Sequence, residues 1–345
     1  MTQPTVMSAV QLTRHGGPEV LVWRDDLAVP RPGAGEALIR VLAAGVNMTD
    51  INTRVGWYGR GEGRAAGWAG EMAFPRIQGS DLCGRVVAFG DGVDSLPMGA
   101  RVICPTNQSE PAAGNPLHFV SIGSEYDGAF AQYCVVPARH LHDVSASPLS
   151  DVEIGAMPCA YGTAHNLLTR ARVAVGERVL VTGASGGVGL AAVQLGILCG
   201  AEVVGQCSVG KAQAVRAAGA GVLDRETVPA QRSFDVVIDV VGGPGWAARL
   251  EALRPGGRYA TSGAVAGPMV QGDLRTVYLN DLTIYGATHQ PREVFAGLVT
   301  IINTARIRPV VSQTYPLHDI ARAQADLAAG RYAGKLVLVP SELTT

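Results

Sequence analysis

The sequence predicts an α/β protein of two domains, one β-rich and built from both ends of the chain, the other built from alternating strands and helices. With 345 residues, the chain exceeds what one hydrophobic core usually organises. Short β-rich runs fill residues 1 to about 150, and a strand–helix alternation begins at about residue 154. From about residue 308 short strands return, so we expect this last part to fold back onto the first.

The N-terminal part is typical of an all-β body with few helices. Runs such as Ala37–Leu42, Arg85–Phe89 and Gln132–Val136 are strand-like, and turn signals rich in Gly and Pro at residues 31–33 and 90–92 separate such runs.

The central part repeats an apolar strand, a glycine turn and an amphipathic helix. This spacing favours a parallel sheet covered by helices. The three pairs are Arg178–Thr182 with Gly189–Cys199, Glu202–Gln206 with Lys211–Ala218, and Asp235–Val240 with Trp246–Leu253.

The last part predicts strands at Val310–Tyr315 and Lys335–Val339 around a helix near Asp319–Ala328. Two other stretches, Gly56–Ala73 and Pro105–Asp127, have the composition of long loops. Loops of this length in a compact domain are often lids over a site, or disordered.

Composition excludes several classes of partner. The 28 basic and 29 acidic residues nearly cancel, and no block of Lys and Arg occurs, so the charge pattern of a protein that binds nucleic acid or an anionic membrane is missing. We expect a small-molecule partner. Residues 1–10 do not resemble a leader, and no apolar run of about 18 residues occurs, which predicts a cytoplasmic protein. The six cysteines are scattered without CxxC, as in a protein with reduced, packed thiols.

The strongest motif is an apolar strand that runs into a glycine-rich turn and then a helix. The turn contains Ala184, Gly186, Gly187, Val188 and Gly189. A pyrophosphate binds backbone N–H groups at the positive end of a helix, so the turn must be nearly free of side chains, and its last glycine lets helix and strand approach closely. Because the motif lies within a repeated strand–helix pattern, we predict a dinucleotide site rather than a packing turn.

The choice of dinucleotide depends on the end of the second strand, where NAD enzymes place an acidic side chain. Here that strand runs into Cys207-Ser208-Val209-Gly210-Lys211, without Asp or Glu. Ser208 and Lys211 suit a 2′-phosphate, and Arg225 would add a second cation or stack on the adenine. Each charge-assisted hydrogen bond contributes roughly 1.5–3 kcal/mol, so we predict NADPH over NADH. The alternative is that both cations are ordinary surface residues.

Together with the nucleotide motif, four segments resemble the quinone oxidoreductase branch of the medium-chain dehydrogenase/reductase superfamily. They are Ala44–Asp50, Gly79–Gly84, Asp127–Tyr133 and Gly334–Leu338, and the resemblance covers nearly the whole chain. It implies a Rossmann domain that binds NADPH at residues 154–306 and a β-rich GroES-like catalytic domain at residues 1–153 and 307–345.

The same resemblance implies a cofactor cleft between these domains and, commonly, a homodimer. Loops at strand ends, which contain Val241 and Gly263, are expected along the ribose and nicotinamide, and Thr163 is expected to contact the cofactor as well.

Zinc is not expected. The alcohol dehydrogenases of the superfamily hold a catalytic zinc through Cys, His and Cys, and these positions correspond here to Asn47, Ser80 and Cys159. One such ligand out of three does not hold zinc. The separate structural zinc of those enzymes needs four cysteines, of which Cys104–Asp127 contains one. We interpret His140 and His142 as ordinary surface or edge residues.

Without a metal, another group must stabilise the carbonyl oxygen as hydride arrives. The resemblance assigns Asn47 to substrate or ribose positioning and Tyr58 to donation toward a developing enolate oxygen. Asp50 either orients its neighbours or satisfies backbone N–H groups at a helix start. The expected reaction is reduction of a quinone, enone or enal by NADPH.

Two rival functions remain open. A reductase of enoyl thioesters would need a cationic approach to the pocket, for which Arg60 and Arg64 are candidates. A sensor that binds NADPH with little catalysis is the other. Trp57 and Trp68 suggest an apolar, restricted pocket.

Overall fold

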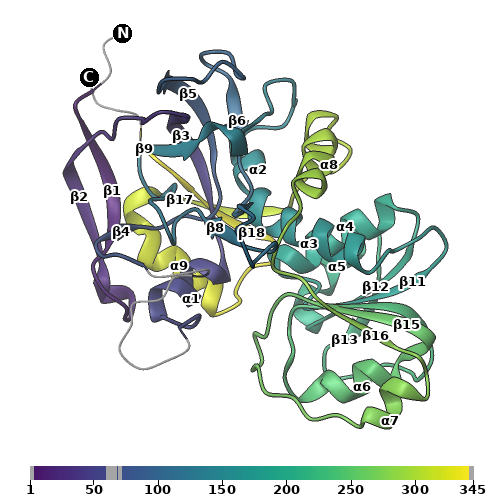
Figure 1. Cartoon of the computed structure of the whole chain (residues 1–345). Coiled ribbons are helices and arrows are strands. Elements are labelled where there is room, and N and C mark those ends of the chain that lie inside the picture. The colour runs from purple at the N-terminus through teal and green to yellow at the C-terminus, as the bar shows by residue number, and fades with distance from the viewer. Residues whose placement is uncertain (1–3, 60–67, 69–71, 342–345) are drawn as a thin grey trace. The chain divides into compact units, whose positions relative to one another are not determined.

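The computed structural model describes residues 4–59, 68 and 72–341 (Figure 1). The chain divides into two compact units. Unit 1 comprises residues 1–159, 291–331 and 335–345, and unit 2 comprises residues 160–290 and 332–334. From the sequence pattern, we expected the divisions after residues 153 and 306, which would place residues 292–303 in the central part. In the structure these residues form α8 (Arg292–Asn303), which groups with unit 1.

Unit 1 is β-rich, as the sequence predicted. One sheet has the strand order β10-β6-β5-β3-β18-β17, with β9 also paired to β3. A second sheet has the order β2-β1-β4, and β7 pairs with β8. The strands are β1 (Val6–Leu12), β2 (Leu21–Ala28), β3 (Glu36–Val46), β4 (Arg76–Ile77), β5 (Cys83–Phe89), β6 (Arg101–Ile103), β7 (Asn107–Ser109), β8 (Phe119–Ser121), β9 (Tyr133–Pro137), β10 (His142–Asp143), β17 (Val311–Pro316) and β18 (Lys335–Val339).

Few helices accompany these strands. They are α1 (Met48–Val55), α2 (Asp151–Gly155), α8 and α9 (Ile320–Ala328), with 3₁₀ turns at Pro18–Val20, Ala138–His140 and Leu317–Asp319. The β7–β8 hairpin lies within Pro105–Asp127, which the sequence predicted to be a loop. Each strand has only three residues, Asn-Gln-Ser in β7 and Phe-Val-Ser in β8. Strands this short do not show the alternation of apolar and polar residues from which a strand is predicted.

The C-terminal strand returns to the N-terminal part. β18 pairs antiparallel with β3, bringing Leu336 opposite Val46, and parallel with β17. Apolar side chains of these strands, including Leu38, Val46 and Leu338, are fully or almost fully buried in one core. Residues almost 300 positions apart thereby meet at the end of β3.

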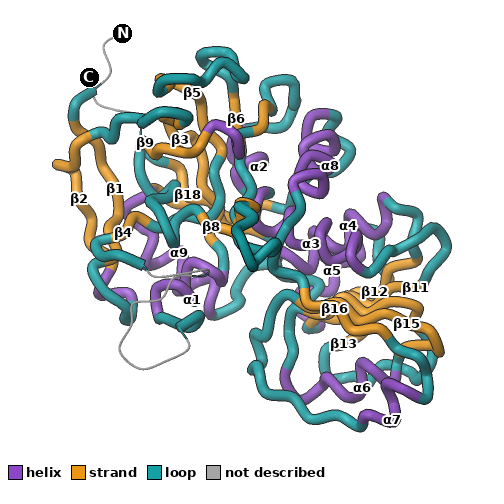
Figure 2. Tube along the Cα trace, in the orientation of Figure 1, coloured by secondary structure: helices purple, strands orange, loops and turns teal. Residues whose placement is uncertain are grey.

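Unit 2 contains a six-stranded parallel sheet in the order β13-β12-β11-β14-β15-β16. Figure 2 shows α4 and α5 on one face of this sheet and α6 and α7 on the other. This is the doubly wound arrangement whose ligands bind at the carboxyl ends of the strands. The elements are α3 (Pro158–Arg170, which begins in unit 1), β11 (Arg178–Thr182), α4 (Gly187–Leu198), β12 (Glu202–Cys207), α5 (Ala212–Ala217), β13 (Gly221–Asp224), β14 (Phe234–Asp239), α6 (Trp246–Glu251), β15 (Leu253–Thr261), α7 (Leu274–Tyr278) and β16 (Thr283–Gly286), with 3₁₀ turns at Val209–Lys211 and Gly243–Gly245.

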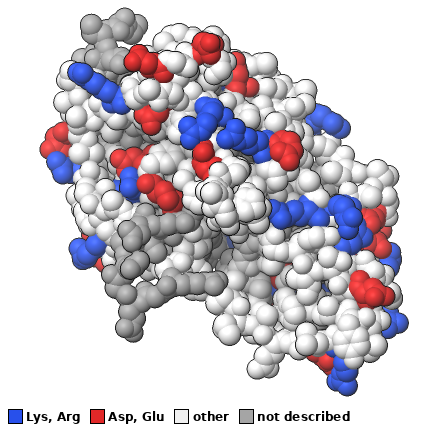
Figure 3. Space-filling model, viewed as in Figure 1, with Lys and Arg blue, Asp and Glu red and all other residues white. Residues whose placement is uncertain are grey.

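The surface carries no dominant charge in the view of Figure 3, where acidic and basic side chains are interspersed. Within the described part of the chain, no helix is both long and apolar enough to cross a membrane.

Candidate active site

A cluster of buried polar side chains forms in unit 1 where β3 ends and α1 begins. Asn47 is the N-cap of α1, with extended backbone (φ −129°, ψ 157°). Asp50, in the first turn, accepts the backbone N–H of Asn47 through Oδ2 at 2.8 Å and that of Ser80 through Oδ1 at 3.1 Å. Asp50 therefore satisfies backbone groups at the helix start and also ties Ser80 to Asn47.

A buried ion pair adjoins these residues. Lys335 and Asp81 are 3% and 0% exposed, and Nζ of Lys335 lies 3.0 Å from Oδ2 of Asp81. Nζ also donates to the carbonyl of Val46 at 3.1 Å and to Oδ1 of Asn47. Asp81 accepts the backbone N–H of Cys159 at 2.6 Å. A buried ion pair is tolerated when further hydrogen bonds satisfy it, and this one is so satisfied.

Gly45 makes room for the ion pair. A Cβ atom at this position would lie 2.2 Å from Oδ2 of Asp81 and 2.8 Å from the carbonyl oxygen of Gly155. No larger residue fits between β3 and the carboxylate without moving backbone. We call the cluster of Asn47, Asp50, Ser80, Asp81 and Lys335 the polar centre.

Charge fixes the orientation of the Asn47 amide within the polar centre. Its Nδ2 donates to Oδ2 of Asp81 at 2.8 Å and to Oγ of Ser80 at 3.1 Å, and its Oδ1 faces the Lys335 ammonium. The reversed amide would place an N–H group against an ammonium and an oxygen against a carboxylate. The Asn47 side chain therefore makes its hydrogen bonds to other residues of the polar centre.

Tyr58 lies close to this cluster. Its Oη is 3.0 Å from Oγ1 of Thr49 and accepts from Nδ2 of Asn52 at 3.4 Å. Its ring stacks on Trp68, with ring centroids 5.2 Å apart. Burial raises the pKa of Tyr58, so its hydroxyl stays protonated at neutral pH and is able to donate.

The sequence also singled out Trp57, Arg60 and Arg64 in the loop that contains Tyr58. Trp57 is 51% exposed, so its side chain is not part of an enclosed apolar pocket. Arg60 and Arg64 lie outside the described residues.

The glycine-rich turn of unit 2 has the geometry of a phosphate cradle. Gly183 has φ +56°, and a Cβ at Gly189 would lie 2.1 Å from the carbonyl oxygen of Gly183. Helix α4 begins at Gly187, and its N-cap, Gly186, is exposed and supplies no side chain to the first turn. The first N–H groups of a helix lack intrahelical partners, so this turn fits a pyrophosphate.

The ends of β12 and β13 place two cations near each other. Ser208 follows β12, and Nζ of Lys211 donates to the carbonyl of Tyr332 at 3.0 Å. Burial, and after it the charge of Arg225, lower the pKa of Lys211. Arg225 itself is 68% exposed and pairs with Glu226. Two neighbouring cations suit a doubly charged phosphate.

Two acidic residues adjoin these cations, Glu226, which pairs with Arg225, and Asp224. Asp224 ends β13 directly beside Cys207, and its Oδ1 accepts the backbone N–H of Glu226 at 2.9 Å. β12 itself ends without an acidic side chain, as the sequence predicted.

Asp239 organises the loop after β14. This fully buried carboxylate accepts the backbone N–H groups of Val241 at 2.8 Å and Gly242 at 3.1 Å, and Arg249 lies 2.9 Å away. The other two residues expected at the cofactor are Gly263, whose Cβ would lie 2.8 Å from the carbonyl oxygen of Val240, and Thr163, half-buried on α3.

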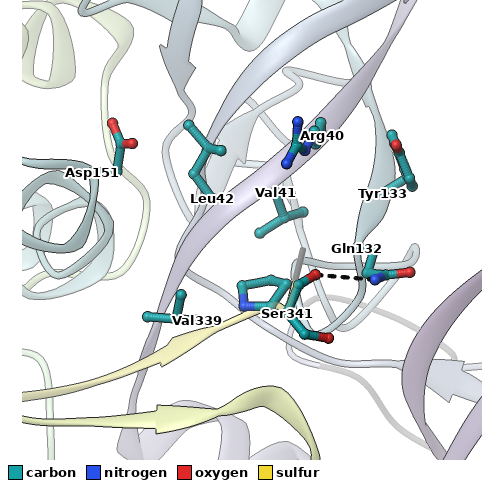
Figure 4. A pocket seen from close by; sticks show the side chains of 9 residues that line it. Arg40, Val41, Leu42, Gln132, Tyr133, Asp151, Val339 and Ser341 are labelled. Atoms are coloured by element: carbon teal, nitrogen blue, oxygen red, sulfur yellow. Dashed lines mark hydrogen bonds between the residues drawn. The ribbon is translucent and has the colours of Figure 1, made fainter. Parts of the chain in front are cut away.

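A separate cavity lies elsewhere in unit 1. Figure 4 shows its polar groups, which come from Arg40, Gln132, Tyr133 and Asp151, and the 3.2 Å hydrogen bond from Gln132 to the carbonyl of Ser341. None of its lining residues belongs to the polar centre.

Comparison with known proteins identifies the family. Residues 33–146 match the alcohol dehydrogenase GroES-like domain, and residues 214–338 match the zinc-binding dehydrogenase family. An acryloyl-coenzyme A reductase from Metallosphaera sedula is 32% identical over 96% of this chain and 99% of its own length. A quinone oxidoreductase from Lama guanicoe is 29% identical over 98% of this chain and 99% of its own length. The chain belongs to the medium-chain dehydrogenase/reductase superfamily, in its quinone oxidoreductase-like branch.

Its fold agrees with that of solved medium-chain dehydrogenases/reductases. The crystal structure of a candidate alcohol dehydrogenase from Sinorhizobium meliloti 1021 is 42% identical, with a TM-score of 0.89 over 98% of both chains. The predicted fold class, a dinucleotide-binding α/β domain with a GroES-like domain, is confirmed, and the protein is an oxidoreductase.

The residues of this medium-chain dehydrogenase/reductase do not fit a catalytic zinc. The amide oxygen of Asn47 already contacts the Lys335 ammonium, and Ser80 offers a neutral hydroxyl. Cys159 is the one thiol among these three residues, and a catalytic zinc needs three protein ligands. Within the described residues, no group of three His, Cys, Asp or Glu side chains is placed to hold a metal.

The interpretation of His140 as a surface or edge residue was wrong. Its side chain is 2% exposed and its Nε2 contacts Oε1 of Glu110. It lies in the 3₁₀ turn Ala138–His140, and the partner that meets it, Glu110, is 30 positions away, which residue spacing alone does not reveal. His142 does lie on an edge strand.

Sequence reasoning gave no role to Lys335, Asp81 or Asp239. The first two lie in segments that carried the family resemblance, and each is a charged residue next to an apolar run. A charge in such a position signals a buried partner, although the sequence does not say which partner.

The titration of Asp50 gives a testable pH dependence. Burial raises its pKa to about 7, far above the value of about 3.9 in an unfolded chain. Between about pH 4 and pH 7 the native state therefore holds a proton that the unfolded state has lost, and stability falls as pH rises, by at most about 1.4 kcal/mol per pH unit. We expect the free energy of unfolding of the wild type to decline relative to Asp50→Asn across this window and to level off above it. Urea titrations of both proteins from pH 4.5 to 8 measure this, and parallel curves would contradict it.

Proposed function

We propose that this oxidoreductase uses NADPH to reduce a small quinone or α,β-unsaturated carbonyl compound without a metal ion. The observation that carries the proposal is the chemistry of the polar centre. Where metal-dependent relatives need ligands, this chain has an amide held by an ammonium, a hydroxyl and one thiol, at Asn47, Ser80 and Cys159. The N–H groups of the amide are engaged within the polar centre, and a single thiol does not supply the set of ligands that zinc needs. A hydroxyl donor such as Tyr58 would then stabilise the carbonyl oxygen in place of a Lewis acid.

Bound NADPH would supply a hydride to the electrophilic carbon of the acceptor. The protein contributes binding and orientation. In this proposal the backbone N–H groups at Gly187 to Gly189 hold the pyrophosphate, Ser208, Lys211 and Arg225 hold the 2′-phosphate, and Val241, Gly263 and Thr163 contact the rest of the cofactor. Tyr58 donates its hydroxyl hydrogen toward the substrate oxygen, since its raised pKa keeps that hydrogen in place.

Enoyl thioesters are a second candidate class of acceptor. The 32% identity to an acryloyl-coenzyme A reductase over almost the whole chain favours them. Both classes contain a carbonyl conjugated to a carbon–carbon double bond, so the same centre serves either.

The function is tested by NADPH oxidation with metal-stripped protein in the presence of a chelator. The panel contains quinones, enones, enals and enoyl thioesters. We expect turnover with at least one conjugated class and no gain on adding zinc, because Asn47, Ser80 and Cys159 do not make a set of zinc ligands. NADPH binding without turnover of any acceptor would favour a sensor, and activity that returns only with zinc would refute the metal-free proposal.

Cofactor preference is tested at Lys211. Loss of one charge-assisted hydrogen bond to the 2′-phosphate costs roughly 1.5–3 kcal/mol, so Lys211→Ala should reduce the ratio of kcat/KM for NADPH over NADH by about 10- to 100-fold. Lys211→Arg should keep most of the preference. The matched control is Arg275→Ala, which removes an exposed cation of the same unit that is paired with Asp273. It should leave the ratio of kcat/KM for NADPH over NADH unchanged. An unchanged ratio in Lys211→Ala would remove this residue from cofactor recognition.

A further inference from the structure

Two neighbouring strands of the unit 2 sheet end in polar residues that contact each other. β11 ends at Thr182 and β14 ends at Asp239, and the parallel pairing of Val181 with Ile238 brings these last residues side by side. They are 1% and 0% exposed, and Oγ1 of Thr182 donates to Oδ1 of Asp239 at 2.5 Å. Doubly wound sheets bind ligands at the carboxyl ends of their strands, so this pair lies at the edge where a cofactor is expected.

The pair holds the backbone of the loop that follows β14. The N–H of Val240 donates to Oγ1 of Thr182 at 3.2 Å. The N–H groups of Val241 and Gly242 donate to Oδ1 of Asp239 at 2.8 and 3.1 Å. Two side chains therefore bind three consecutive backbone N–H groups. Gly242 has φ +62°, which side chains disfavour, so the loop follows a path that needs this glycine as well as these hydrogen bonds.

The other oxygen of Asp239 is anchored separately. Nη1 of Arg249 lies 2.9 Å from Oδ2 and also donates to the carbonyl of Gly242 at 2.7 Å, and the Tyr259 hydroxyl donates to Oδ2. Burial works against ionisation of Asp239, but the Arg249 guanidinium and the hydrogen bonds outweigh it and lower the pKa of this carboxyl. At neutral pH the group is a carboxylate that only accepts hydrogen bonds, and it cannot turn without losing several of them.

The loop lies directly beside the glycine-rich turn. A Cβ at Gly183, the residue after Thr182, would lie 3.1 Å from Cγ2 of Val241. On its other side, the carbonyl oxygen of Val240 would lie 2.8 Å from a Cβ at Gly263. Thr182 thus ends the strand that leads into the phosphate cradle, and its hydroxyl binds the loop that is expected along the ribose and nicotinamide.

We propose that Thr182 is a positioning residue of the cofactor site. Through its hydroxyl and Asp239 it holds the loop of residues 240–242 against the glycine-rich turn, and so presets the place of the nicotinamide end of NADPH. This inference rests on the proposed function and deepens it. The turn and the loop would contact different parts of one dinucleotide, so a fixed distance between them makes a single bound orientation favourable without ordering the loop on binding.

The first test compares two ligands in Thr182→Val, which keeps the side-chain volume and removes the hydroxyl. The Kd for NADPH should rise roughly 10-fold, because binding of the nicotinamide end must now order the loop. The Kd for 2′-phospho-ADP-ribose, which lacks nicotinamide, should stay unchanged, whereas a general loss of structure would raise both values. Thr182→Ser keeps the hydroxyl and should bind both ligands as the wild type does.

The matched control removes another buried hydroxyl of unit 2. Tyr161 is 2% exposed and donates to Oε1 of Gln194 at 2.5 Å, away from the loop of residues 240–242. Tyr161→Phe should leave the ratio of the two Kd values unchanged.

Backbone hydrogen exchange gives a readout that needs no cofactor. In the wild type, the amides of Val240, Val241 and Gly242 should exchange slowly, because each donates to Thr182 or Asp239. In Thr182→Val these amides should exchange at least about 10-fold faster, while those of β12 keep their rates. If Thr182→Val does not fold, the wild-type rates still test the proposal.

The outcomes separate this inference from the proposed function. An unchanged ratio of the two Kd values in Thr182→Val, an equal rise of both, or fast exchange of the loop amides in the wild type would overturn the role of Thr182. Turnover of an acceptor by the wild type would leave the reductase function standing in each case. A wild type that binds NADPH but reduces no acceptor would refute the function, and the Kd ratio would still decide the role of Thr182.

Discussion

The buried ion pair between Lys335 and Asp81 is the interaction on which the polar centre depends. Two opposite charges, 3.0 Å apart and almost fully buried, are stable only if every remaining hydrogen bond is made. Val46, Asn47 and the backbone of Cys159 make those bonds. Because the pair needs these hydrogen bonds, it fixes the backbone at the end of β3 and the orientation of the Asn47 amide. It also holds β18, from the far end of the chain, beside them.

The fold supplies this pair by joining distant segments. β18 lies against β3 because its apolar residues complete the core of unit 1, and the first residue of β18 is Lys335. Burial of Leu336 and Leu338 offsets the cost of removing the ammonium from water. The consequence is a site whose polar side chains are held in fixed orientations by the ion pair.

Patterns in the sequence predicted the fold well because its determinants are local or periodic. The strand–helix alternation and the turn from Ala184 to Gly189 identified unit 2, and the turn has the backbone geometry that a pyrophosphate needs. The β7–β8 hairpin was missed because its strands are short. Helix α8 groups with unit 1 because its packing depends on tertiary contacts that a repeat pattern does not contain.

Within the site, the sequence indicated the residues but not their connections. Asn47 and Asp50 were singled out, yet the amide proves to be occupied by Lys335, Asp81 and Ser80. Hydrogen-bond saturation is a property of three-dimensional geometry, and residues 254 positions apart in the chain, such as Asp81 and Lys335, give no local signal of their pairing.

A double-mutant cycle tests the ion pair most directly. The free energies of unfolding of Lys335→Met, Asp81→Asn and the double variant are measured in urea against the wild type. Removing one partner of a buried pair costs roughly 3–5 kcal/mol, because the other charge stays buried without compensation. The account predicts that the double variant is destabilised by well under the sum of the single effects. Effects that add within about 0.5 kcal/mol would show that the two charges do not depend on each other and would contradict the account.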